Sequence, residues 1–352
     1  MKKPFYRKTF FKILLITFLA GIIVCGGVAL WTWEQVYKPN VSISQNETAY
    51  LFIPTGSSFE AVKDMLYRNN LIKNRKSFEW VAKRKGLKNH IKAGKYEVLP
   101  NMNNNDLTNL LRSGKQSPVD LTINNIRTKD RLAGRISELL EVDSAQLEHV
   151  LNDPSFLEQY GKTPETAITL FIPNTYQFFW NTDAEQFVER MKKEYDKFWN
   201  PERRAKAENV GLSIDEIMTL ASIVQEETNK NEEKARIAGV YMNRIKSKWP
   251  LQADPTLKFA LGNFTIRRVL DEHKKINSPY NTYKNTGLPP GPICMPDISS
   301  IDAVLDYELH NYYYFCAKDD LSGYHVFSAS LSQHNINAKK YHNALNRLKI
   351  YQ

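Results

Sequence analysis

The chain has 352 residues, of which 42% are hydrophobic, 12% aromatic and 24% charged, and this composition excludes a disordered or collagen-like protein. Its length predicts two globular domains, and its three cysteines are too few for a disulfide scaffold. The net charge of +10 is concentrated in two segments, because residues 1–12 carry five cations and no acid, and residues 63–95 carry eleven cations and two acids.

The N-terminal segment predicts a membrane anchor. Residues 13–33 contain no charge, and a helix of that length crosses a hydrocarbon core of about 30 Å. A cleaved signal peptide is the alternative, but the apolar stretch of a signal peptide is only about 7–15 residues long. The apolar segment of this chain is longer, and it ends in Trp31 and Trp33, which suit the membrane interface. The preceding cations predict that residues 1–12 lie in the cytoplasm. The rest of the chain is then expected on the periplasmic or outer side of the cytoplasmic (inner) membrane, where nucleic acid is not an expected partner.

Residues 34–117 predict a linker followed by a small α/β module. The predicted elements are a polar linker at 38–46, a strand at 49–56, a helix at 59–70 capped by Ser57 or Ser58, a helix at 77–84, a strand at 94–100, and a helix at 106–114 capped by Asn105 or Asp106 and stopped by Gly114. The basic run at 63–95 is expected to be a solvated face. Contact with anionic wall polymer or lipid headgroups is the alternative.

Residues 118–352 predict a larger domain of mixed α+β structure. The predicted elements are a strand at 170–176, a helix at 183–199, a hairpin that joins 312–317 to 324–328, and a terminal helix from Ser332 onward. The middle of this domain can be assigned only loosely from the sequence.

One helix in this domain has an unusually clear pattern. Ser213 and Glu216 have the spacing of a capping box at a helix N-terminus. Apolar residues then recur at intervals of three and four, which defines a buried face. These residues are Ile217, Leu220, Ala221 and Val224.

Two adjacent acids at the end of this helix are expected to differ. Glu227 continues the apolar stripe, whereas Glu226 points about 160° away from Val224, given about 100° per residue. We therefore expect Glu226 to be solvated and Glu227 to be desolvated, with the raised pKa that a general acid requires at neutral pH. The alternative for Glu227 is a structural ion pair with Arg236 or Arg244.

Polar residues further along the chain are candidates to line a cleft. Their amide, hydroxyl, carboxyl and imidazole groups suit the hydroxyl and amide groups of a sugar. They are Gln252, Asp254, Thr256, Asn281, Tyr283, His325, His334 and Asn335. A metal site at His325, His334 and His342 is the competing interpretation, but the sequence has no HExxH pattern and no Cys/His pair at ligand spacing. We therefore expect neither a metal nor a cofactor.

The cysteines allow at most one bridge within the chain. Cys25 lies in the apolar run, so Cys294 and Cys316 are the only plausible pair. Two buried free thiols are the favoured interpretation.

Seven motifs, in a fixed order, make the chain recognisable. They are ASIVQEET, VYMNRI, LQADPT, PYNTY, TGLPPGPI, HVFS and SQHN. With these motifs the chain resembles the MltG (YceG-like) family of endolytic murein transglycosylases, over the anchor, the small module and residues 118–349. The resemblance implies an α+β protein with a single N-terminal transmembrane helix, a LysM-like module within residues 34–117, and a YceG-like catalytic domain at 118–352.

The resemblance also assigns a role to one acid. In the family the second Glu of the helix motif is catalytic, and that position is Glu227 here. The first Glu of the motif is Gln225 in this chain, so a second carboxylate in the motif is not essential. A second departure places Asn174 where the family tends to have Asp, which leaves substrate contacts on that strand open.

The implied reaction is lytic cleavage of the bond between MurNAc and GlcNAc in nascent glycan strands, which leaves 1,6-anhydro-MurNAc ends. Glu227 would protonate the leaving oxygen and then accept the proton of the 6-hydroxyl of the same sugar. One carboxyl group then suffices, whereas hydrolytic glycosidases usually use two. The implied partners are peptidoglycan strands and the membrane, with wall-synthesis or division proteins as further candidates. A non-enzymatic glycan-binding scaffold and a hydrolytic muramidase are the alternatives.

Overall fold

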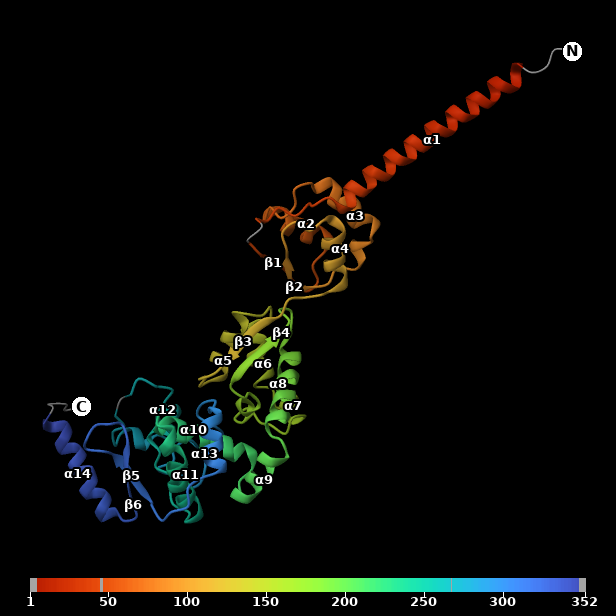
Figure 1. Cartoon of the computed structure of the whole chain (residues 1–352). Coiled ribbons are helices and arrows are strands. Elements are labelled where there is room, and N and C mark those ends of the chain that lie inside the picture. The colour runs from red at the N-terminus through yellow and green to blue at the C-terminus, as the bar shows by residue number, and fades with distance from the viewer. Residues whose placement is uncertain (1–4, 45–46, 267, 348–352) are drawn as a thin grey trace. The chain divides into compact units, whose positions relative to one another are not determined.

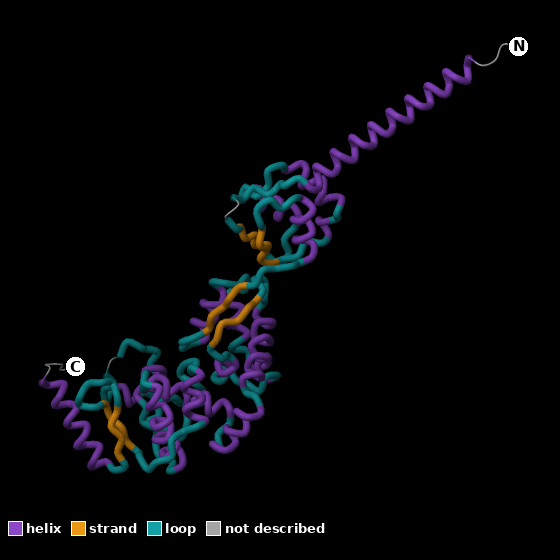
Figure 2. Tube along the Cα trace, viewed as in Figure 1, coloured by secondary structure: helices purple, strands orange, loops and turns teal. Residues whose placement is uncertain are grey.

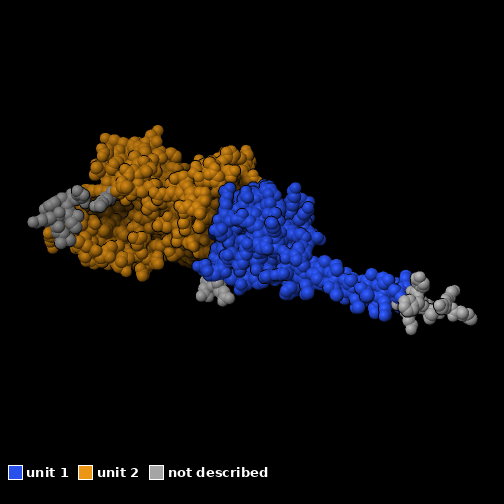
Figure 3. Space-filling view, turned by 90° about the horizontal axis from the view of Figure 1, so that it is seen from above, with its two compact units in different colours: residues 1–119, 178–181 blue, residues 120–177, 182–352 orange. Residues whose placement is uncertain are grey.

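The computed structural model describes residues 5–44, 47–266 and 268–347, and the chain divides into two compact units (Figure 3). Unit 1 comprises residues 1–119 and the short segment 178–181, and unit 2 comprises residues 120–177 and 182–352. In the described residues helices are combined with two-stranded sheets (Figures 1 and 2), so the predicted α+β class is confirmed.

The N-terminal helix α1 (Phe5–Tyr37) contains the whole predicted anchor segment. Within the described ranges it is the one helix that is long and apolar enough to cross a membrane, and its apolar side chains from Phe10 to Trp33 are exposed. The end of α1 packs within unit 1. The Trp31 ring lies edge-on to Trp80 with the ring centroids 5.3 Å apart, and the Asn104 side chain donates a hydrogen bond to Gln35 O at 2.8 Å.

The rest of unit 1 surrounds one apolar core. Its elements are β1 (Ala49–Ile53), α2 (Phe59–Arg68), α3 (Arg75–Arg84), the 3-10 turn η1 (Leu87–Asn89), β2 (Gly94–Val98) and α4 (Asn104–Ser113). Strands β1 and β2 pair antiparallel, and alternate residues of β2 face the core. The fully buried core residues include Ile53, Val62, Leu66, Phe78, Tyr96 and Leu111.

The helix caps in unit 1 agree only in part with the prediction. Ser58 caps α2, and Gly114 ends α4 in the left-handed conformation, as predicted. The N-cap of α4, however, is Asn103 and not Asn105 or Asp106. Asn103 has the extended backbone of an N-cap residue, and its Oδ1 accepts a hydrogen bond from Asp106 N at 2.9 Å.

The predicted linker at 38–46 is partly folded over residues 38–44, and its residues 45 and 46 lie outside the described residues. Asn40 and Val41 are buried, and the Asn40 amide donates to Asn104 Oδ1 at 2.7 Å. A linker prediction from polar composition was wrong here, because an asparagine side chain can replace water as the partner of buried polar groups.

The basic run at 63–95 is a solvated face only in part. Lys83 and Lys88 are exposed. Lys85, in contrast, donates to Asn109 Oδ1 at 2.7 Å, and the Arg84 guanidinium lies 4.0 Å from the centroid of the Trp80 ring. Some of these cations therefore serve packing within the module.

Unit 2 consists mainly of helices. Its first part contains β3 (Val119–Ile123), α5 (Lys129–Ser137), α6 (Ser144–Val150), α7 (Pro154–Glu158), η2 (Ala167–Leu170), β4 (Asn174–Phe178), α8 (Ala184–Phe198) and α9 (Pro201–Val210). Its second part contains α10 (Ile214–Glu227), α11 (Asn231–Lys246), α12 (Asp254–Ala260), η3 (His273–Lys275), α13 (Ile298–Leu305), β5 (Tyr314–Ala317), β6 (His325–Ser328) and α14 (Leu331–Arg347). Helix α10 packs against both α11 and α13 (Figure 1), which places it in the interior of the unit.

The strand predicted at 170–176 begins later than expected. The chain forms the turn η2 up to Leu170, and β4 starts only at Asn174, where it pairs with β3. Pro173 explains the difference, because it has no N–H to contribute to a strand ladder.

The other predicted elements of unit 2 are found close to their expected positions. Asp183 caps α8. The predicted hairpin is confirmed, since β5 and β6 pair antiparallel from Tyr314 opposite Ser328 to Ala317 opposite His325. The terminal helix begins one residue before the predicted start, and the predicted residues 348–352 lie outside the described residues.

All three cysteines are free, so the prediction that Cys294 and Cys316 do not form a disulfide is confirmed. Cys294 is buried, and its thiol donates to Ser222 O at 3.7 Å. Cys316 is partly exposed on β5, so only one of these two thiols is buried as expected. Burial raises the pKa of the Cys294 thiol well above its ordinary value, so the thiol stays protonated and unreactive.

Candidate active site

Helix α10 carries the acid that the sequence singles out. Its capping box is confirmed, because Ser213 Oγ accepts from Glu216 N at 3.3 Å and Glu216 Oε2 accepts from Ser213 N at 2.8 Å. Every residue from 217 to 224 is buried, which fixes the helix in the interior. The helix ends at Glu227, so this side chain leaves the buried part of the helix at its C-terminal end.

Glu227 lies where a carboxylate is poorly stabilised. Burial raises the pKa of Glu227 to about 7, and the negative charge of Asp254 acts in the same direction. The partial negative charge at the C-terminal end of α10 also disfavours the ionised form. A hydrogen bond from Tyr241 and the charge of Arg244 lower the pKa without cancelling the increase. A group with a pKa near 7 can both donate and accept a proton at neutral pH.

The structural alternative for Glu227 is not found in the described part of the chain. Arg236 pairs with Glu308 at 2.9 Å instead. Arg244 is 7% exposed, and its guanidinium donates to two backbone carbonyls. Glu227 therefore has no ion-pair partner among the described residues.

Tyr241 on α11 is the direct partner of Glu227. Its hydroxyl donates to Glu227 Oε1 at 2.6 Å. The Tyr241 residue is 1% exposed, and the Phe315 ring packs edge-on against it with the centroids 5.9 Å apart. Burial and the nearby Glu227 charge raise the pKa of Tyr241 well above its ordinary value, so the phenol keeps its proton and stays a donor.

A cavity of about 340 Å³ opens beside Glu227, and we call it the catalytic cavity. Five predicted site residues line it, namely Glu227, Gln252, Asp254, Tyr283 and His334. Further lining residues are Tyr241, Arg244, Tyr314, Phe315 and Leu331. Parts of α10, α11, α12, β5 and α14 thus meet at this cavity.

Polar groups form one wall of the catalytic cavity. The Tyr283 hydroxyl donates to Asp254 Oδ1 at 2.5 Å, which fixes both side chains. Gln252 has a φ of 50°, in the left-handed region that residues other than glycine rarely adopt. Its N–H donates to Thr282 O at 3.0 Å, so a strained residue is held at the cavity.

An imidazole and aromatic rings form another wall. His334 stacks on Tyr314 with the ring centroids 5.3 Å apart and an angle of 25° between the rings. Burial lowers the pKa of His334, and the charge of Arg244 acts in the same direction, so the imidazole is neutral at pH 7. Its Nδ1 is buried and has no hydrogen-bond partner in the described ranges. A neutral ring of this kind can accept or donate one hydrogen bond to a sugar.

Four predicted site residues lie outside the catalytic cavity. Thr256 and Asn281 are fully buried, and their side chains donate to backbone carbonyls, so their polar groups hold the chain in shape. His325 Nδ1 lies 2.9 Å from Glu233 Oε2, and Asn335 is exposed on α14. Within the described residues no three His, Cys, Asp or Glu side chains gather as metal ligands, at His325 or elsewhere.

The sequence prediction omitted several residues that line the catalytic cavity. Tyr241 and Arg244 lie three residues apart on α11, which puts them on one face of that helix. The spacing of these two residues within the VYMNRI motif could have predicted that both side chains face the same site. Tyr314 and Phe315 reach the cavity from the hairpin, and no local pattern marks them.

The prediction of a solvated Glu226 was wrong. Its Oε2 accepts a hydrogen bond from Arg127 Nη2 at 2.7 Å, and its side chain is only 19% exposed. The segment before α5 covers this face of α10, and no periodicity within α10 could reveal such a long-range contact. Gln225 accepts a hydrogen bond from Asp297 N at the start of α13, a role in which an uncharged amide suffices.

Comparison with known proteins identifies the family of this chain. The profile of the YceG-like family matches residues 51–340. The endolytic murein transglycosylase of Bacillus subtilis is 31% identical over 335 residues, which cover 91% of each chain. The endolytic murein transglycosylase of Streptococcus pneumoniae is 28% identical over 365 residues, which cover 95% of this chain and 66% of that protein. A crystal structure of a yceG-like protein from Listeria monocytogenes is 31% identical, with a TM-score of 0.53 over 82% of this chain and 99% of that one. This chain therefore belongs to the YceG-like family.

Proposed function

We propose that the chain is a membrane-anchored endolytic lytic transglycosylase of peptidoglycan, which cleaves between MurNAc and GlcNAc and leaves 1,6-anhydro-MurNAc ends. The observation that carries this proposal is the carboxyl group of Glu227, with a pKa of about 7, at the end of a buried helix beside a polar cavity. The names of the Bacillus subtilis and Streptococcus pneumoniae relatives support the same activity.

Glu227 acts in two steps of this reaction. Its proton passes to the oxygen of the leaving GlcNAc while the bond from that oxygen to MurNAc C1 breaks. The resulting carboxylate then takes the proton of the MurNAc 6-hydroxyl, and the 6-oxygen forms a bond to C1. Glu227 ends protonated as it began, and no water is consumed. The nucleophile, the 6-oxygen, belongs to the same sugar as C1, so no water molecule has to be bound and positioned for the attack.

The other residues of the catalytic cavity hold the sugar and the acid. Tyr241 orients Glu227 through its hydrogen bond. The Asp254 carboxylate favours the positive charge that develops at C1 in the transition state. We propose Gln252, Tyr283 and His334 as contacts to sugar hydroxyl and amide groups. His325 and Asn335 would contact more distant parts of the strand, outside the catalytic cavity.

The presence of Asp254, a second carboxyl group in the catalytic cavity, supports hydrolysis as a second candidate reaction. Glycosidases that hydrolyse usually place two carboxyl groups at the bond, and one of them activates water or forms a covalent intermediate. Mass spectrometry of digested peptidoglycan distinguishes the two reactions. We expect anhydro ends, and we expect Glu227→Gln to abolish them. Hydrated reducing ends would identify a muramidase, and intact strands would indicate a non-enzymatic scaffold.

We further propose that α1 lies in the cytoplasmic membrane with the N-terminus inside, and that residues 34–117 form a LysM-like glycan-binding module. The length and apolar surface of α1 support the first point, together with the five cations in residues 1–12. A protease added to intact cells whose outer layers have been removed should digest the module and the catalytic domain. A tag fused before residue 1 should survive that treatment.

A further inference from the structure

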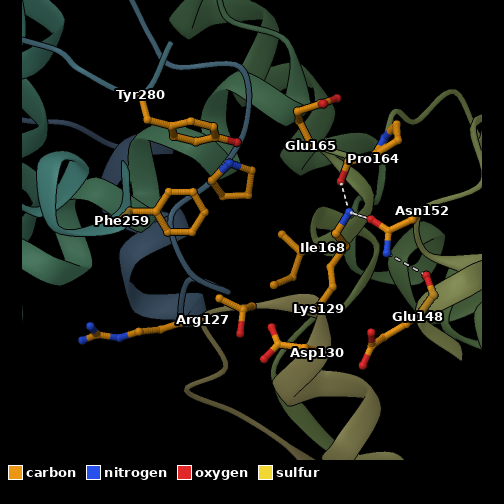
Figure 4. Close-up of a pocket in the computed structure, with 12 residues that line it drawn as sticks. Arg127, Lys129, Asp130, Glu148, Asn152, Pro164, Glu165, Ile168, Phe259 and Tyr280 are labelled. Carbon is orange, nitrogen blue, oxygen red and sulfur yellow. Dashed lines mark hydrogen bonds between the residues drawn. The ribbon is translucent and has the colours of Figure 1, made fainter. Parts of the chain in front are cut away.

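The cavity at the N-terminal end of α5 is separate from the catalytic cavity. Its volume is about 430 Å³, and among the described residues the two cavities share no lining residue. Figure 4 shows that the lysine of this cavity is bound by the protein itself. Lys129 Nζ donates to Pro164 O at 2.8 Å and to the Asn152 side chain. A different feature, a group of aromatic rings, adjoins the catalytic cavity.

Three aromatic rings in contact with one another lie beside the catalytic cavity, and we call them the aromatic platform. They are the rings of Trp249, Tyr313 and Tyr314. The Trp249 ring lies edge-on to both tyrosines, with its centroid 5.2 Å from that of Tyr313 and 5.9 Å from that of Tyr314. Tyr314 also lines the catalytic cavity, where it stacks on His334. The platform therefore continues the aromatic wall of the catalytic cavity out to Trp249.

The Trp249 side chain is exposed, although its burial would stabilise the protein. The residue is 42% exposed, whereas the two tyrosines of the platform are partly buried. A tryptophan ring has a large apolar area, and removing that area from water is favourable. Single exposed apolar side chains are common on protein surfaces. This ring, however, belongs to a cluster that borders a polar cavity, and such a border is typical of a ligand site.

The backbone holds Trp249 in a defined position. Its N–H donates to Arg244 O at 2.8 Å, which closes the end of α11. Lys248 has a φ of 54°, in the left-handed region that residues other than glycine rarely adopt. Pro250 forms an isolated bridge with Thr286. Because the ring is carried by a constrained turn, little backbone freedom is lost when a ligand binds to it.

A sugar ring is the ligand that suits this surface. The sugars of a peptidoglycan strand carry their hydroxyl and acetamido groups around the edge of the ring, so the flat face of each ring consists of C–H groups. Such a face packs on an aromatic ring, while the polar edge binds hydroxyl groups of the protein. The platform supplies both kinds of contact, since the Tyr313 hydroxyl and Ser247 Oγ lie 3.0 Å apart at the same turn.

We propose that Trp249 forms a sugar-binding subsite, which holds the glycan strand beyond the sugar bound in the catalytic cavity. This inference rests on the proposed function. A strand that continues from Tyr314 to Trp249 keeps one sugar at Glu227 and stacks a further sugar on the exposed ring. The subsite therefore adds affinity for the strand and takes no part in breaking the bond.

Calorimetry tests the subsite without cleavage. A stem-free peptidoglycan hexasaccharide is titrated into the full-length Glu227→Gln protein in detergent. With Trp249→Ala added, the hexasaccharide should bind about 3- to 10-fold more weakly, as expected for the loss of one stacking contact. Trp249→Phe keeps an aromatic face and should change the affinity by less than about twofold, whereas Trp249→Leu should behave like Trp249→Ala. Leu309→Ala, at a residue that is 81% exposed in the same unit, is the control and should leave the affinity unchanged.

Indole fluorescence locates the bound sugar. A sugar stacked on Trp249 should change the emission of the Glu227→Gln protein when the hexasaccharide is added. In Trp249→Phe this change should be lost, while calorimetry still detects binding. The subsite is overturned if the hexasaccharide does not bind, if Trp249→Ala binds it as well as the parent does, or if the emission change persists undiminished in Trp249→Phe.

Kinetics distinguish a failure of the subsite from a failure of the proposed function. On glycan strands Trp249→Ala should raise KM about 3- to 10-fold and leave kcat unchanged, because the ring binds the substrate and the transition state equally well. A fall in kcat at unchanged KM would overturn the subsite. If the parent protein binds the hexasaccharide but cleaves no strand, the proposed function fails, and the calorimetric comparison still decides whether Trp249 binds a sugar.

Discussion

Glu226 and Glu227 are adjacent in the chain, yet the structure gives them opposite partners. The Arg127 guanidinium binds the first at 2.7 Å, and the Tyr241 phenol donates to the second at 2.6 Å. A guanidinium stabilises an ionised carboxylate, whereas a phenol also tolerates the protonated form. The helix thus presents one acid held in an ion pair and one acid that can exchange a proton.

This pairing predicts that only Glu227 is needed for chemistry. Glu227→Gln keeps the size and the hydrogen bond from Tyr241 but cannot deliver a proton. Formation of anhydro ends should fall by about 100- to 10,000-fold, as expected for the loss of a general acid. Mass spectrometry of the digest measures the loss, and the circular dichroism spectrum checks that the fold is kept.

Glu226→Gln is the matched control. The amide can still accept a hydrogen bond from Arg127, so the rate should change by less than about threefold, and the cost in stability should be about 1 kcal/mol. If Glu226→Gln were the inactive variant, both the assignment of the acid and the family resemblance would be wrong at this position.

Tyr241 sets the pH range of the reaction. Its hydrogen bond lowers the pKa of Glu227, so its loss in Tyr241→Phe should raise that pKa further above about 7. The rate should fall as pH increases and Glu227 loses its proton, and in the variant this fall should shift to higher pH. Rates measured from pH 5 to pH 9 test the shift. Tyr195→Phe, in a buried site on α8, should leave the profile unchanged, and a shift to lower pH in Tyr241→Phe would contradict the role assigned to the phenol.

The parts of the site that the sequence predicts are those with local causes. The capping box at Ser213 and the apolar stripe of α10 depend on residues three or four positions apart, so the helix and the direction of Glu227 follow from the sequence. The hairpin around β5 and β6 is predictable for the same reason, because its turn residues lie between two short apolar runs.

The rest depends on packing between distant segments. Arg127 covers Glu226 from a position 99 residues earlier in the chain, and Tyr314 and Phe315 reach the catalytic cavity from the hairpin. Thr256 and Asn281 have polar side chains that suit a sugar equally well, but both are used by buried backbone groups. Residue type alone does not separate a ligand contact from an internal hydrogen bond.

The thiols should be dispensable. Because Cys294 and Cys316 are both free, a reducing agent should leave the thermal unfolding temperature unchanged. Replacement of both by Ala should keep the activity within a few-fold, at a cost of about 1–2 kcal/mol for the small cavity left at Cys294. A large drop in the unfolding temperature on reduction would show that a disulfide forms after all.

The raised pKa of Glu227 also predicts how stability depends on pH. In the unfolded chain this group releases its proton near its ordinary pKa of 4.5, and in the folded protein it does so only near 7. Between these values the unfolded state binds fewer protons than the folded state, so this group reduces stability as pH rises through that window. At about 1.4 kcal/mol per pKa unit, the penalty reaches about 3 kcal/mol above pH 7. Glutamine has no charge to bury, so Glu227→Gln should match the parent near pH 4.5 and exceed it by up to about 3 kcal/mol at pH 8.

Denaturant unfolding of the full-length protein in detergent, at pH 4.5 and at pH 8, measures this difference. The sign of the change in the free energy of unfolding distinguishes Glu227 from Glu226, because Glu226→Gln removes an ion pair and should not stabilise the protein at pH 8. A gain of stability in Glu227→Gln together with a loss of activity is the pattern expected of an acid that is kept in an unfavourable environment for its function. If Glu227→Gln destabilises the protein at pH 8, the carboxylate is a structural group, and its assignment as the proton donor fails.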